Sequence, residues 1–105
     1  MKKKSLLTAV MAAVMLCMTT VPAMAGEWIQ DGVNWRYYTD KGNPVTGWLE
    51  INGSWYYFAA SGVMSTGWVK VDEGWYFLHD DGTMAHDTWI DNYYVNGSGR
   101  WVKTR

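Results

Sequence analysis

Cysteine and histidine are scarce in this sequence, and their scarcity argues against several classes of protein. The single cysteine, Cys17, cannot form a disulfide framework within the chain. The two histidines, His79 and His86, lie beside aspartates in predicted turns, where solvated turn chemistry accounts for them. The sequence contains no nucleophile elbow, phosphate-binding loop or zinc-ligand spacing. We therefore predict a protein with no enzymatic activity, no catalytic residues, no metal site and no cofactor.

The first 25 residues have the composition of a secretory signal peptide. Three lysines at positions 2–4 precede a short apolar stretch at positions 6–18, and residues 23–25 form a small-residue cleavage site. The apolar stretch is shorter than the ~20 residues that a membrane-spanning helix needs. We predict cleavage after Ala25, which leaves a secreted mature domain at residues 26–105.

Positive charge is scarce in this predicted mature domain. Six basic and ten acidic side chains remain there, which gives a net charge of −4. Nucleic acids and anionic membranes attract basic patches. We therefore expect no nucleic-acid partner and no membrane insertion after processing, and the charge mildly suits a cationic ligand.

Residues 26–105 also lack the apolar period of 3.6 residues that is typical of an amphipathic helix. Turn signals recur instead about every ten residues and separate short runs rich in aromatic side chains. The sequence therefore predicts an all-β domain without helices.

What the domain does contain is aromatic residues in a repeat of about 20 residues. Three ladders share this spacing: Trp28, Trp48 and Trp68; Trp35, Trp55 and Trp75; and Gly42, Gly62 and Gly82. A period near 20 residues is typical of stacked supersecondary units rather than of one globular core. We expect four units, at about residues 27–46, 47–66, 67–87 and 88–105.

The second unit shows the structure expected of each repeat. Asn52-Gly53 predicts a tight type I′ hairpin turn, because both central positions of that turn need a positive φ. The aromatic run at residues 55–58 fits a half-buried strand. The corresponding hairpin turns are expected at Asp31-Gly32 in the first unit and at residues 72–74 in the third.

The fourth unit departs from this pattern. Only three residues separate Trp89 from Tyr93, so its hairpin is about four residues shorter, and Asn92 replaces the second Trp. Trp101 falls in the position that Met64 and Met84 hold in the preceding units. Because a stacked array needs atypical end units, we expect this unit to be the C-terminal cap.

Side-chain alternation divides each strand into two faces. Trp55 and Tyr57 share one face, and Tyr56 and Phe58 share the other, which we expect to be core. Two Trp of one hairpin can then form two walls of an aromatic box whose third wall comes from the neighbouring unit. Such boxes bind quaternary ammonium by cation–π attraction, and flat rings also stack on sugars. Met64 and Met84 are expected to be packing residues rather than to form the bottom of the aromatic boxes.

The units GWLEINGSWYYFAASGVMST and GWVKVDEGWYFLHDDGTMAH closely resemble the cell-wall-binding, or choline-binding, repeat of secreted proteins of Gram-positive bacteria and their phages. The shared pattern is GW, a short hairpin, W-Y-Y-F/L and then G-x-M. The resemblance covers essentially all of residues 26–99. It implies a solenoid of stacked β-hairpins that holds choline groups of teichoic or lipoteichoic acids between consecutive hairpins. It also implies non-covalent attachment to the cell surface of a Gram-positive bacterium.

The resemblance further implies which residues form each choline-binding box, two Trp coming from one unit and one aromatic residue from the next. The boxes are Trp28, Trp35 and Tyr57; Trp48, Trp55 and Phe77; and Trp68, Trp75 and Tyr94. The alternatives for the third wall are Tyr56, Tyr76 and Tyr93.

Two other functions remain open from the sequence. The rings could serve a carbohydrate-binding module for glucan or host glycan, or they could be the core of a structural protein that forms a homodimer through its end repeats. Similar repeats in clostridial toxins and glucan-binding enzymes often lack the second Trp. Retention of Trp35, Trp55 and Trp75 therefore favours the choline-binding type.

Overall fold

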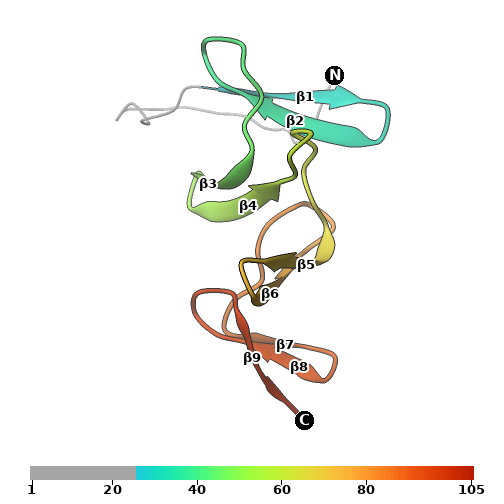
Figure 1. Cartoon of the computed structure of the whole chain (residues 1–105), viewed down its shortest axis with the longest axis vertical. Coiled ribbons are helices and arrows are strands. Elements are labelled where there is room, and N and C mark those ends of the chain that lie inside the picture. Colours follow the sequence, from blue (N-terminus) through green and yellow to red (C-terminus); the bar gives the residue numbers. More distant parts are fainter. Residues whose placement is uncertain (1–25) are drawn as a thin grey trace.

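The computed structural model describes residues 26–105, which form nine strands and no helix. The predicted signal peptide and Cys17 lie outside the described residues. The strands form successive hairpins along the long axis of the molecule, from β1–β2 at one end to β7–β9 at the other (Figure 1). The predicted solenoid of stacked β-hairpins is confirmed.

Each of the first three units is a hairpin of two five-residue strands, and the fourth unit has shorter strands. The strands are β1 (Glu27–Asp31), β2 (Asn34–Tyr38), β3 (Gly47–Ile51), β4 (Ser54–Phe58), β5 (Gly67–Val71), β6 (Gly74–Leu78), β7 (Thr88–Ile90), β8 (Tyr93–Val95) and β9 (Trp101–Thr104). Pairing between strands stays within each unit, so the described part of the chain holds four separate small sheets, and an isolated bridge between Tyr76 and Arg100 links the third unit to the fourth.

The register of the four hairpins is equivalent. The first Trp of each unit lies directly opposite an aromatic residue on the second strand, and these pairs are Trp28–Tyr37, Trp48–Tyr57, Trp68–Phe77 and Trp89–Tyr94. Opposite residues share a face of the sheet. Each hairpin therefore has one face that carries this Trp and its aromatic partner, and we call it the Trp face.

The hairpin turns follow their local sequence. Asn52 and Gly53 both have positive φ, 53° and 87°, so the predicted type I′ turn is confirmed. In the third unit Asp72 and Glu73 occupy the two central positions, with φ of 47° and 71°. The first turn is corrected by one residue, because Asp31 pairs with Asn34 and leaves Gly32 and Val33 as the central residues.

The fourth unit combines the predicted short hairpin with a strand that was not predicted. Strands β7 and β8 form three pairs, compared with five in each preceding hairpin. The added strand β9 pairs with β8 and completes a three-stranded sheet. Trp101 pairs with Val95. In the same way Met64 bridges to Phe58, and Met84 bridges to Leu78. The predicted equivalence of Trp101 with the two methionines is therefore confirmed.

Consecutive hairpins stack face to face. The Trp28 ring lies 5.1 Å from the Tyr56 ring and 5.7 Å from the Phe58 ring, so the Trp face of one unit meets the Tyr/Phe face of the next. Phe58, Leu78 and Val95 hold equivalent positions in three units, and all three are fully buried. The core is thus a column of side chains between the hairpins, as expected for the face that carries Tyr56 and Phe58.

The turns that connect the units form a second column. Met64 N donates to Trp35 O at 2.7 Å, and Met84 N donates to Trp55 O at 2.8 Å, so each of these turns bonds back to the preceding hairpin. A Cβ on Gly62 would lie 3.1 Å from Pro44 Cβ, and one on Gly82 would collide with the Met64 side chain. These glycines also have φ of +87° and +89°. Glycine at these two positions is therefore required by both its backbone conformation and its close contact.

We predict that Glu73→Gly stabilises the protein. A non-glycine residue in the left-handed region costs about 1–2 kcal/mol, and the added freedom of glycine in the unfolded chain offsets part of that gain, which leaves about 0.5–1 kcal/mol. Urea unfolding followed by Trp fluorescence measures the change. Gly53→Ala is the matched control, because Gly53 holds the equivalent position with free space around its Cβ, and it should destabilise. A Glu73→Gly protein no more stable than the parent would contradict the prediction.

Candidate ligand-binding site

Aromatic rings gather at each junction between consecutive units. We call the contacts between the first and second, second and third, and third and fourth units junctions 1, 2 and 3. At junction 1 the rings of Trp28 and Trp35 lie 6.2 Å apart at an interplanar angle of 82°. Both belong to one hairpin, so the two Trp rings of junction 1 lie together on the same face.

The ring that reaches each junction from the following unit is not the one first expected. Tyr56 contacts Trp28 at 5.1 Å, Tyr76 contacts Trp48 at 5.0 Å, and Tyr93 contacts Trp68 at 5.7 Å between ring centroids. These three residues are the alternatives that the sequence left open. Each lies on the face of its hairpin that is turned toward the preceding unit.

The residues first expected as third walls lie on the opposite face. Tyr57 packs on Trp48 of its own hairpin at 4.9 Å, Phe77 on Trp68 at 5.2 Å, and Tyr94 on Trp89 at 5.2 Å. The structure therefore brings Tyr57 and Phe77 to the junction after the expected one, and it places Tyr94 on the outer face of the fourth unit. Strand alternation makes Tyr56 and Tyr57 face opposite ways, and the stacking of the hairpins turns the Tyr56 face toward the preceding unit.

Junction 3 contains a pocket of about 340 Å³ lined by Trp68, Trp75, Tyr93 and Trp101. All four lining side chains are aromatic. Trp75, Tyr93 and Trp101 are 39%, 41% and 37% exposed, so the pocket opens to solvent. The short fourth hairpin thus places Tyr93, rather than the expected Tyr94, against the two Trp of the third unit.

Trp101 is the wall that the sequence reasoning missed. Its ring stands at 88° to the Tyr93 ring with centroids 5.6 Å apart, and its Nε1 donates to Lys103 O at 3.1 Å. Its equivalence with Met64 and Met84 was visible in the sequence, but a wall at that position was not expected. Only the pairing of β9 with β8 brings the indole to the pocket.

The aromatic face of the fourth unit carries cations from the chain itself. The guanidinium carbon of Arg105 lies 4.2 Å from the Trp89 centroid, and Lys103 Nζ lies 5.3 Å from the Tyr94 centroid. Arg105 is held in place, since its backbone N donates to Asn92 O and its guanidinium donates to Asp91 O. The rings of this repeat therefore attract positive charge, as the π faces of Trp and Tyr do in general.

Other chemistry finds little support in the described part of the chain. Within residues 26–105 no group of three or more His, Cys, Asp and Glu could hold a metal ion. His79 stacks edge-on against Phe77, and His86 pairs with the neighbouring Asp87 in an exposed position. Among the described residues no helix is long and apolar enough to cross a membrane.

Comparisons with known proteins agree with this geometry. A family model described as the choline-binding repeat matches residues 45–89. The choline binding domain of Spr1274 from Streptococcus pneumoniae is 38% identical with a TM-score of 0.71, and the match covers 78% of this chain and 100% of that one. A comparison with curated proteins gave no match.

Two larger proteins are similar over part of their length. Choline binding protein F of S. pneumoniae is 38% identical with a TM-score of 0.71, over 76% of this chain and 27% of its own. The multimodular cell wall endolysin from phage Cp-1, solved in complex with choline, is 34% identical with a TM-score of 0.68, over 85% of this chain and 28% of its own. The present chain thus spans about a quarter of each of them.

We predict that packing at the junctions makes the fold sensitive to alkali. Burial raises the pKa of Tyr56 above its usual value of 10.0, and the carboxylate of Asp81 raises it further. The unfolded chain therefore ionises first, so the stability linked to Tyr56 is complete below its unfolded-state pKa and is lost as the pH rises through its folded-state pKa.

Urea unfolding at neutral and alkaline pH measures this loss. Tyr56→Phe, which cannot ionise, should lose less stability in alkali than the parent protein. Tyr37→Phe should act in the same direction, because burial also raises the pKa of Tyr37. Equal loss in the parent and both variants would show that these tyrosines do not cause it.

Proposed function

The chain belongs to the choline-binding repeat family, and from this premise we propose that it is a secreted, non-catalytic module that binds choline groups of teichoic or lipoteichoic acids. It would thereby attach non-covalently to the surface of a Gram-positive bacterium. The domain at residues 26–105 would be the working part, after cleavage of a signal peptide at residues 1–25. The observation that carries the proposal is the four-ring pocket at junction 3.

A trimethylammonium group suits this pocket chemically. It cannot donate strong hydrogen bonds, so it needs no carboxylate in the wall, and the pocket lining is entirely aromatic. Each π face that it meets contributes about 0.5–2 kcal/mol once water is removed. The position of Arg105 over Trp89 shows the same attraction within the chain.

Equivalent positions define the proposed choline sites at the other two junctions. They are Trp28, Trp35 and Tyr56 at junction 1, Trp48, Trp55 and Tyr76 at junction 2, and Trp68, Trp75, Tyr93 and Trp101 at junction 3. Met64 and Met84 hold the position of Trp101, and their backbone nitrogens bond to Trp35 and Trp55. Their side chains pack instead on Gly82 and Gly99 in the turns of the following units, so within residues 26–105 only junction 3 has a fourth aromatic wall.

A carbohydrate-binding module is the second candidate, because the Trp55 and Trp75 rings are exposed enough to stack on a sugar. Choline binding protein F and the Cp-1 endolysin were also solved with a peptidoglycan analogue, a tetrasaccharide-pentapeptide. Self-association through the end repeats is the remaining alternative. Titration with choline, tetramethylammonium and glucose distinguishes these functions.

We predict that choline and tetramethylammonium produce saturable changes in Trp fluorescence and that glucose does not. The reason is that both cations present methyl-bearing positive charge to the rings. Trp55→Ala should weaken binding at junction 2 about tenfold, in keeping with the loss of one cation–π wall. Isothermal titration calorimetry on the parent and the variant measures the change.

Val33→Ala is the control, because Val33 is 90% exposed in a hairpin turn away from the junctions. A response to sugars without a response to either ammonium ion would favour the carbohydrate-binding alternative. Concentration-dependent association with no response to any ligand would favour the structural one.

A further inference from the structure

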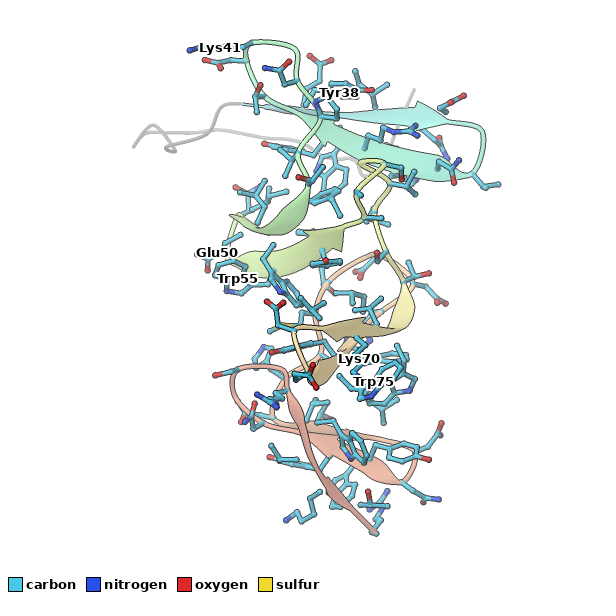
Figure 2. The ribbon with its side chains drawn as sticks, in the orientation of Figure 1. Tyr38, Lys41, Glu50, Trp55, Lys70 and Trp75 are labelled. Atoms are coloured by element: carbon cyan, nitrogen blue, oxygen red, sulfur yellow. The ribbon has the colours of Figure 1, made fainter. Side chains whose placement is uncertain are left out.

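The residue at one position on the Trp face differs in charge from one hairpin to the next. This position lies directly opposite the second Trp, and the pairs are Gln30–Trp35, Glu50–Trp55 and Lys70–Trp75. Glu50 and Lys70 are both exposed, and Figure 2 shows each beside its Trp. The three junctions thus carry a neutral, an acidic and a basic side chain at equivalent places.

Strand geometry puts this side chain at the edge of the proposed choline site. Lys70 lies two residues after Trp68 on β5, so the two share a face, and Trp75 lies directly across on β6. Directly opposite residues have Cβ atoms about 5 Å apart. Lys70 is therefore next to two of the four rings that line the pocket at junction 3.

Neither charge is neutralised by a partner. The ion pairs within the described residues are Asp31–Arg36 and His86–Asp87, and they include neither Glu50 nor Lys70. Lys103 and Arg105 lie over the rings on the far face of the fourth unit, and the Arg100 guanidinium donates to Glu73 O. Lys70 and Glu50 are thus free to act on a ligand.

The two charges act in opposite ways on two forms of the ligand. Free choline is a cation, so a nearby carboxylate attracts it and a nearby ammonium repels it. Choline esterified to phosphate also carries a negative charge a short chain away from its nitrogen. With the trimethylammonium group among the rings, Lys70 can pair with that phosphate, whereas Glu50 would repel it.

We infer that the junctions differ in ligand preference, with junction 3 selecting choline that carries a phosphodiester and junction 2 selecting choline without one. Lys70 and Glu50 are the residues that set the preference. Junction 1, which has the neutral Gln30, is expected to show a preference intermediate between those of junctions 2 and 3. The inference rests on the proposed choline-binding function and adds the chemical form of choline that each site takes.

The test compares choline with glycerophosphocholine at each junction of the full mature chain. The indole N–H signals of an isotope-labelled protein, assigned with Trp55→Phe and Trp75→Phe, report junctions 2 and 3 separately. The ratio of the choline Kd to the glycerophosphocholine Kd should be higher at junction 3 than at junction 2. Lys70→Gln should lower the ratio at junction 3 about two- to fivefold, the size expected for one exposed charge pair.

Three further variants make the comparison specific. Glu50→Gln should raise the ratio at junction 2 by a similar factor, and Lys70→Arg should keep the preference of junction 3. Lys41→Gln removes the same charge from the connecting turn of the first unit, far from junction 3 (Figure 2), and should leave its ratio unchanged. Added salt should shrink the effects of Lys70→Gln and Glu50→Gln, because it screens exposed charges.

The outcomes separate this inference from the proposed function. Choline binding with equal ratios at junctions 2 and 3, or with no effect of Lys70→Gln, would overturn the inference and leave the proposed function intact. No response to choline at either junction would overturn both.

The phosphodiester could belong to a wall polymer or to a lipid headgroup, and a sedimentation experiment distinguishes them. Lys70-dependent retention on choline-bearing walls, but not on phosphatidylcholine vesicles, would place the ligand of junction 3 on the polymer. Lys70-dependent retention on the vesicles would place it on a lipid. Retention that ignores Lys70 on both surfaces would contradict a phosphate contact.

Discussion

The packing of each Trp face against the Tyr/Phe face of the next hairpin is the interaction on which the rest of this structure depends. A two-stranded hairpin alone is at best marginally stable in water. Stacking removes Phe58, Leu78 and Val95 from solvent entirely, and it brings aromatic rings together in tilted and edge-on contacts. Because the rings that form the core continue into the walls of the junctions, folding and formation of the proposed sites are a single process. A ligand held between two units would therefore also stabilise their contact.

The connecting turns determine how far one unit lies from the next. Their backbone bonds to Trp35 and Trp55 join consecutive hairpins without joining their sheets. Glycine at positions 62 and 82 lets the Pro44 and Met64 side chains of the preceding units approach closely. Ring packing and turn packing thus both determine the spacing between consecutive units. This explains why a short Gly-containing turn recurs with the same period as the two Trp.

The fourth unit shows how the repeat changes while keeping its register. Its hairpin loses two residues from each strand, and with them the second Trp. Strand β9 compensates by placing Trp101 at junction 3 and the cations of Lys103 and Arg105 on the outer aromatic face. Junction 3 is consequently a four-ring pocket, whereas the methionines at the equivalent backbone positions of the second and third units pack their side chains on the glycine of the next turn.

The sequence alone determined the features that depend on neighbours along the chain. Hairpin positions, the turn at Asn52-Gly53, the period of about 20 residues and the pairing of two Trp in each unit all follow from turn chemistry and side-chain alternation. Tertiary structure alone decided which face of a hairpin meets the preceding unit, and hence that Tyr56 rather than Tyr57 contacts Trp28. It also decided that Trp101 closes junction 3, through the pairing of β9 with β8. Alternation defines two faces of each strand but does not determine which face is turned toward the preceding unit, because that depends on how separate units stack.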